Sequence, residues 1–248
     1  MAVLVFIYGL ITGSFLNVCI YRIPRQMSVV NPPSACPACG HRLRWFELVP
    51  LVSFIIQRGR CLSCSAAVAW RYPIVEILTG AFFSLSYYLY GLSIDFWTVI
   101  ILASLMLVVA FIDIEHRIIP NRLVIFGLAA GLVMGLLRPD AGIVFMAKGL
   151  LAGFGALFAV AVLSRGQMGF GDVKLAAVMG LFLGWQEVLL ALFLAFLAGA
   201  IYGIFLMVFM GKGRKTAVPF GPFLAGATIA VYLWAEQITL WYIQAILG

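Results

Sequence analysis

Long apolar runs separated by short polar turns make up most of the chain. Because an α-helix needs about 20 mostly apolar residues to cross a bilayer, these runs predict about eight transmembrane helices. We place them near residues 1–21, 73–90, 95–112, 118–137, 142–163, 172–185, 187–210 and 217–235. The sixth run spans roughly 21 Å at 1.5 Å per residue, so we expect it to tilt or to line a cavity rather than face lipid. The stretch 238–247 is too short to cross and is expected at the membrane interface.

Composition agrees with this pattern. Hydrophobic residues occupy 65% of the 248 positions and charged residues only 10%. A soluble domain has about 45–50% apolar and about 25% charged residues, which excludes a soluble globular protein, a disordered chain and a disulfide-rich secreted scaffold. Strands of an outer-membrane barrel would alternate in segments of about ten residues, whereas these runs are continuous. The predicted fold class is an all-α polytopic membrane protein.

Basic residues are concentrated on alternate connections between the predicted helices. They group as seven Arg between Arg22 and Arg71, then Arg117 with Arg122, Arg165 with Lys174, and Lys212 with Arg214 and Lys215, with Arg138 and Lys148 elsewhere. Cytoplasmic loops carry such an excess of Lys and Arg, so these loops are predicted to be cytoplasmic and the N-terminus to lie outside. The distribution does not suggest a nucleic-acid partner. Because no basic segment precedes the first apolar run, we interpret it as a retained helix and not a signal peptide.

Residues 22–72 interrupt the apolar pattern with seven Arg, five Pro and four of the five Cys. The chain is therefore predicted to comprise a first transmembrane helix at 1–21, a small cytoplasmic insert at 22–72 and a transmembrane helical bundle at 73–248. An insert of about 50 residues lacks the core to fold alone, and a bound metal can supply the missing stability.

The cysteines of the insert are spaced as metal ligands. Cys36 and Cys39 form one Cys-x-x-Cys pair and Cys61 and Cys64 a second, with 21 residues between the pairs. Four thiolates complete a closed tetrahedral zinc shell without an open position, so the predicted zinc is structural. The intervening length exceeds the usual range of about 15–20 residues, and we expect a longer β-hairpin to absorb the excess. Two disulfides or a redox pair are the alternatives, and Cys19 is interpreted as a packing residue.

Two acidic residues lie where a membrane protein should avoid charge. Asp113 ends the third predicted helix and Asp172 opens the sixth. The fourth and fifth helices run out and back between them, so both carboxyls are expected at one depth on the cytoplasmic side. Two neighbouring carboxyls share a proton because both cannot ionise easily. Such a pair can activate water and protonate a leaving amine, as in aspartic proteases.

The glycines before Asp172 favour close approach of a substrate backbone, since Gly169 and Gly171 have no side chains. The alternatives are that Asp172 caps its helix and that Asp113 pairs with Arg117 at the interface. Other polar residues near the same leaflet are candidates for supporting roles. Glu115 and His116 follow Asp113, Lys174 is expected to reach the interface, and Glu76 is interpreted as pairing with Arg71 or contacting a ligand. The chain contains no zinc-protease, nucleophile-elbow, Walker or dinucleotide motif.

Nearly the whole chain resembles the type IV prepilin peptidases, the bifunctional prepilin leader peptidase/N-methyltransferases. The resemblance is carried by Gly13-Ser-Phe-Leu-Asn17-Val, Tyr21-Arg-Ile-Pro24, Asn31-Pro-Pro-Ser34, Gly59-Arg-Cys61, Arg71-Tyr-Pro73-Ile-Val-Glu76, Asp113 with Pro120-Asn121, Gly169-Phe-Gly-Asp172-Val-Lys174, Gly184-Trp-Gln186 and Pro219-Phe-Gly-Pro222. One departure is Leu48, where many members have Asn.

The resemblance implies cleavage of the basic leader of prepilins and pseudopilins on the cytoplasmic side of the bacterial inner membrane, with Asp113 and Asp172 as the catalytic pair. It also implies methylation of the new N-terminus by S-adenosylmethionine, a role associated with the insert. Glu47 and Glu115 are candidate partners for the basic leader. The small residues of the last five predicted helices are interpreted either as docking surfaces for the substrate helix or as close packing between helices.

Three other functions remain open from the residues alone. One is a peptidase of this kind that has lost methyl transfer. Another is a transporter that uses the two Asp as a proton relay, although no inverted repeat is visible in the sequence. The third is a membrane scaffold whose zinc insert binds a partner.

Overall fold

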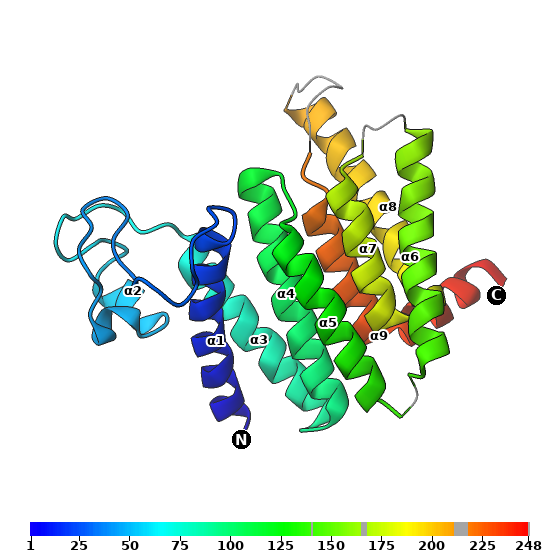
Figure 1. Cartoon of the computed structure of the whole chain (residues 1–248), viewed down its shortest axis with the longest axis horizontal. Helices are drawn as coiled ribbons and strands as arrows, with labels where there is room; N and C mark the ends of the chain where they lie inside the picture. The colour runs from blue at the N-terminus through cyan, green and yellow to red at the C-terminus, as the bar shows by residue number, and fades with distance from the viewer. Residues whose placement is uncertain (140, 165–167, 211–217, 248) are drawn as a thin grey trace. The chain divides into compact units, whose positions relative to one another are not determined.

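The computed structural model describes residues 1–139, 141–164, 168–210 and 218–247, and in this part of the chain the regular secondary structure is helical, with two isolated β-bridges in addition. The elements are α1 (Ala2–Arg22), η1 (Trp45–Leu48), α2 (Val52–Ile56), α3 (Arg71–Tyr90), α4 (Ile94–His116), α5 (Asn121–Leu137), α6 (Ile143–Leu163), α7 (Phe170–Leu183), α8 (Trp185–Phe209) and α9 (Gly221–Leu247) (Figure 1). The long helices coincide with the predicted apolar runs, which confirms the all-α class.

Four helices are each long and apolar enough to cross a membrane by themselves, within the described ranges: α1, α4, α6 and α8. Shorter apolar helices cover Asn121–Leu137 and Gly221–Ala235. The protein is therefore a multi-pass membrane protein. The basic residues Arg165, Lys212, Arg214 and Lys215, which the topology prediction used, lie outside the described residues.

The chain forms two compact units, Met1–Ser104 and Leu105–Gly248, and α4 passes from the first into the second. The predicted division at residues 21 and 72 stays a prediction. In the first unit α1 packs along α3, and glycines make this contact possible. A Cβ on Gly9 would lie 2.6 Å from the Cα of Gly80, and one on Gly13 would lie 2.7 Å from the Cα of Glu76. The four-residue spacing on α1 is the small-residue pattern typical of close helix pairs in membranes.

In the second unit α7 is the central helix. All its residues from Val173 to Leu183 are buried, apart from the half-buried Lys174. The helices α5, α6, α8 and α9 pack around it (Figure 1). A helix that is apolar all round belongs in an interior. This explains how a 14-residue helix is accommodated, and it agrees with the expectation that the short sixth run does not face lipid.

Glycines also set the packing in this unit. A Cβ on Gly149 of α6 would collide with the carbonyl oxygen of Gly180 of α7, and a Cβ on Gly153 would collide with that of Ala176. On α5, Gly127 and Gly131 receive the side chains of Val178 and Phe182 in the same way. At these positions small residues serve packing within the bundle.

The last helix continues further than the predicted span. α9 runs from Gly221 to Leu247, but its backbone departs from helical geometry at Trp234 (φ −137°, ψ 22°). The predicted break near residue 235 corresponds to this kink, and the stretch 238–247 is helical beyond it.

The insert differs from the prediction between its cysteine pairs. The 21 intervening residues contain the short helices η1 and α2, so the expected long β-hairpin is wrong. Its β structure is limited to the bridges Ala35 to Arg42 and Arg60 to Ala67. Pro50 and the polar turns around these segments limit extended pairing.

Candidate catalytic and metal sites

Asp113 lies in the last turn of α4, and its side chain is held by the start of α9. The residue is 6% exposed, and its Oδ2 accepts a hydrogen bond of 2.7 Å from the backbone N–H of Gly221. Gly221 begins α9, so its N–H points outward from a helix N-terminus, where no intrahelical carbonyl can accept it. A Cβ on Gly221 would lie 2.8 Å from that same oxygen. Only glycine permits this approach of the backbone.

Asp172 is the third residue of α7 and is half-buried. Its charge interacts with that of Asp113. The structure therefore places the two predicted catalytic carboxyls close enough, within the second unit, for the charge of one to affect the other. The N-cap of α7 is Gly169, which provides no side-chain cap. A Cβ on Gly169 would lie 3.2 Å from Oδ2 of Asp172, so the absence of a side chain there leaves this carboxylate uncovered.

The neighbours of the pair have separate roles. The Nζ of Lys174 donates a hydrogen bond of 3.0 Å to Oδ1 of Asn121, at the start of α5. This contact ties α7 to α5. The glutamate and histidine that follow Asp113 lie 3.9 Å apart, His116 Nε2 to Glu115 Oε2, and Glu115 is exposed. The positive charge of Arg117 also acts on Asp113.

Glu76 is buried within the first unit. It is 6% exposed, and its Oε2 accepts a 2.9 Å hydrogen bond from the N–H of Leu51, the residue before α2. Nearby, the side-chain amide of Asn17 on α1 donates a 3.1 Å hydrogen bond to the carbonyl of Tyr72 in the first turn of α3. These polar contacts fasten α1, α3 and the insert to one another.

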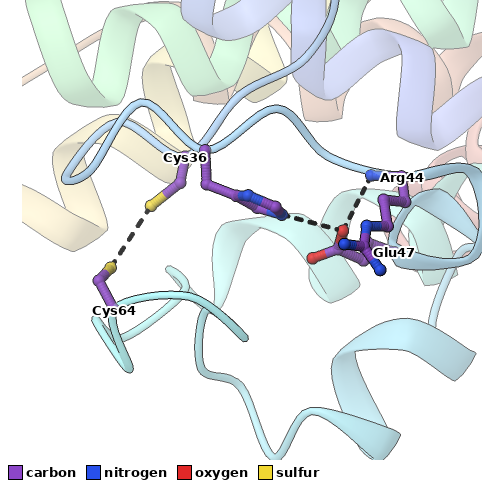
Figure 2. A network of polar contacts seen from close by, with 5 residues as sticks. Cys36, Arg44, Glu47 and Cys64 are labelled. Carbon is purple, nitrogen blue, oxygen red and sulfur yellow. Dashed lines mark hydrogen bonds and ion pairs between the residues drawn. The ribbon is translucent and has the colours of Figure 1, made fainter.

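Glu47 is enclosed by the insert. Its Oε2 accepts the N–H of Arg44 at 2.9 Å and lies 3.3 Å from Nε2 of His41 (Figure 2). The Arg44 N–H and, more weakly, His41 lower the pKa of Glu47. Since the side chain is 1% exposed and its Oε2 is occupied by these partners, the carboxylate faces the interior of the insert.

The four predicted zinc ligands converge. The Sγ atoms of Cys36, Cys39, Cys61 and Cys64 all lie within 4.8 Å of one another. Figure 2 shows the side chains of Cys36 and Cys64 directed toward each other, with their Sγ atoms 3.9 Å apart. Ligands at the usual Zn–S distance of about 2.3 Å in a tetrahedron are about 3.8 Å apart. No disulfide joins any of these cysteines, so the geometry fits a metal ion and not a pair of bridges.

Two equivalent turns create this arrangement. In the first, the N–H of Cys36 bonds to the carbonyl of His41 and the N–H of Gly40 to that of Cys36; in the second, Cys61 bonds in the same way to Ala66 and Ser65 to Cys61. The fifth residue of each turn has positive φ, 71° at Gly40 and 58° at Ser65. The second turn repeats the hydrogen bonds of the first, 25 residues later in the chain. Each turn directs two thiols to one point.

The pKa values of the thiols indicate that the cysteine site requires a positive charge. Backbone N–H groups of Cys39 and Ala38 lower the pKa of Cys36 to about 7. For Cys64 the N–H of Ala66 lowers the pKa, but the neighbouring sulfur of Cys39 and burial outweigh it and raise the pKa to about 11. Four crowded thiols cannot all ionise without a compensating charge. A divalent cation supplies that charge, so the donor set suits a metal centre.

Sequence reasoning missed Gly221 as a residue of the carboxylate site and Asn17 as a link between α1 and α3. Both lie in motifs that carry the family resemblance, Pro219-Phe-Gly-Pro222 and Gly13-Ser-Phe-Leu-Asn17. The motifs could have flagged them, but no spacing rule indicates that a residue 108 positions away meets Asp113.

Comparison with known proteins agrees with this geometry. The bacterial Peptidase A24 N-terminal domain matches residues 7–90, and the Type IV leader peptidase family matches residues 100–204. The prepilin leader peptidase/N-methyltransferase of Bacillus subtilis is 36% identical over 99% of both chains. The protein of the same name from Pseudomonas aeruginosa is 34% identical over 95% of this chain and 91% of its own. No solved structure was found to match significantly. The chain belongs to the type IV leader peptidase family.

Proposed function

We propose that this protein is an intramembrane aspartyl endopeptidase that removes the leader peptide of type IV prepilins or pseudopilins. The observation that carries the proposal is the pair Asp113 and Asp172, two weakly exposed carboxyls from different helices whose charges interact, in a leader peptidase chain. The transporter and scaffold interpretations do not account for the family membership.

The pair supplies both proton transfers of hydrolysis. The Gly221 N–H donates to Asp113 at 2.7 Å, and such a donor binds an ionised acceptor best. Asp113 is therefore the proposed base, which takes a proton from the water that attacks the scissile carbonyl. Asp172 is the proposed acid, which passes its proton to the leaving amine nitrogen as the C–N bond breaks. The uncovered backbone at Gly169 gives the substrate chain access to this carboxyl.

The site is proposed to face the cytoplasm of a bacterial inner membrane. Support comes from the basic loops at the same ends of the helices as Asp113 and Asp172. The exposed Glu115 is the proposed contact for the basic leader, because Glu47 is enclosed in the insert. The cytoplasmic orientation and the role of Glu115 are both inferred from the positions of charged residues along the chain.

Zinc is the proposed ion of the cysteine site, held by Cys36, Cys39, Cys61 and Cys64. With four thiolate ligands it has no open position for water or substrate. Its proposed role is to hold the insert together, and hydrolysis is left to the carboxyl pair.

Methyl transfer is proposed as a second activity, on the basis of the name that the relatives bear. S-adenosylmethionine would supply an electrophilic methyl group to the new N-terminal amine. Among the residues that the structure describes, none is assigned to the donor, so the monofunctional peptidase remains the alternative. Product masses with and without the donor decide between them.

The test of the catalytic pair is cleavage of a prepilin by the purified protein in lipid. Asp113→Asn and Asp172→Asn should each lower the rate of leader removal at least about a hundredfold, the usual contribution of a positioned acid or base. Asp95→Asn is the matched control, since Asp95 lies in the first turn of the same α4. Cleavage that persists in both site variants would show that another group performs the reaction.

A further inference from the structure

The insert carries large apolar side chains that the described residues leave uncovered. Trp45 is 80% exposed, Ile55 71%, Ile56 75% and Trp70 72%. Together we name them the α2 patch. They come from adjoining elements, because η1 packs against α2 and the ring of Phe54 on α2 lies 5.2 Å from that of Trp70. Scattered apolar residues on a surface are ordinary, but a grouped set of this size usually marks an interaction site.

Chain continuity and one hydrogen bond hold the patch beside the beginning of α3. Trp70 directly precedes Arg71, the first residue of α3. Leu51, the N-cap of α2, donates its N–H to Glu76, which lies five residues into α3, or about 7.5 Å along the helix axis. The short helix α2 is therefore held level with the first turns of a predicted membrane helix. The start of a predicted membrane helix corresponds to the headgroup region, where Trp side chains are enriched.

The charge of the insert matches an anionic surface. Residues 22–72 contain seven Arg and a single acidic residue, Glu47, whose carboxylate is buried among its own partners. Arg44 just before η1 and Arg58 and Arg60 just after α2 are exposed. Basic side chains around an apolar surface favour anionic lipid headgroups. A basic leader peptide would be repelled from the same surface.

We infer that the α2 patch dips into the headgroup region of an anionic bilayer, with the neighbouring Arg side chains on lipid phosphates. The lipid then holds the cysteine turns at the membrane surface. The inference uses the predicted membrane insertion of α1 and α3, and it does not depend on peptidase activity.

Fluorescence quenching in nanodiscs tests this directly. The full-length protein is reconstituted in phosphatidylcholine with or without phosphatidylglycerol, using lipids brominated near the headgroup. The emission of Trp45 is obtained by subtracting the spectrum of the Trp45→Phe variant. We expect bromolipid to quench most of this emission in the anionic discs, and salt to reduce the quenching. Emission that bromolipid leaves unchanged and aqueous iodide quenches would overturn the inference.

A matched pair of variants locates the contact. Ile56→Asn should abolish most of the Trp45 quenching, whereas Val30→Asn should not, since Val30 is equally exposed (79%) but lies outside the patch. The thiol reactivity of the cysteine turns, unchanged in both variants, shows that the insert remains folded. Equal quenching in Ile56→Asn and Val30→Asn contradicts the assignment of the patch. A Trp45 signal that changes only on addition of a prepilin would show that the surface binds protein and not lipid.

Discussion

At the scale of single residues, the orientation of Asp113 depends on one backbone N–H. In Gly221→Ala the new Cβ would lie 2.8 Å from the carboxylate oxygen, so the carboxylate and α9 must separate and the hydrogen bond is lost. A hydrogen bond to a charged group is worth about 1.5–3 kcal/mol, which predicts a decrease in prepilin cleavage of about tenfold to a hundredfold.

The control for this prediction is Gly226→Ala in the same helix, where the added Cβ meets no atom within 4 Å. Steady-state cleavage rates with the substrate saturating compare the two variants. Equal rates would mean that the Gly221 N–H does not orient the carboxylate.

A second residue-scale prediction concerns Glu47. The Arg44 N–H and His41 hold its pKa below the usual value, so the ionised carboxylate stabilises the folded insert. This contribution is complete above the unfolded pKa of about 4.3 and is lost as the pH falls through the lower folded pKa. Glu47→Gln should lower the thermal unfolding temperature at neutral pH, and the difference from the unsubstituted protein should shrink as the pH falls below about 4.3. A difference that grows on acidification would contradict this role.

At the scale of helices, the crossing of α6 and α7 leaves no room for a side chain. A Cβ on Gly149 would collide with the backbone of Gly180, and a rigid backbone cannot move aside as a flexible side chain can. Gly149→Ala is therefore expected to cost about 1–3 kcal/mol of unfolding free energy, as for other overpacked contacts.

Unfolding in mixed detergent micelles measures that change. Gly155→Ala, also in α6, is the control because its Cβ would meet no atom within 4 Å. It should be neutral or slightly stabilising, since alanine is the better helix former. If both variants unfold alike, the two helices do not cross as closely as the structure shows.

At the scale of the whole molecule, the cysteine site and the carboxyl pair belong to different compact units. Metal analysis should give about one zinc per chain. Cys39→Ser should lose this zinc and make residues 22–72 sensitive to protease, while the helices around α7 remain protected. Cys19→Ser is the matched control, because Cys19 is buried in α1 away from the cluster. Full zinc content in Cys39→Ser would refute the ligand set.

The sequence by itself determined the helices, the insert and the candidate chemistry. Continuous apolar runs identify membrane helices because burial of the backbone in lipid permits few other structures. Cys-x-x-Cys spacing identifies a metal site because a single backbone turn brings both of its thiols to one ion. Asp113 and Asp172 stood out because a carboxyl among apolar residues is costly. Each of these signals is local, so it can be recognised without knowing which helices are neighbours.

Only the tertiary structure decided which distant groups meet. The N–H of Gly221 on Asp113, the carboxylate of Glu76 on Leu51 and the Gly149–Gly180 crossing join residues between 25 and 108 positions apart. The expected hairpin between the cysteine pairs was wrong for the same reason, since η1 and α2 pack against each other and the residue before α2, Leu51, bonds to Glu76 of α3. Such contacts depend on helix order and rotation, and hydropathy along the chain does not encode either of these.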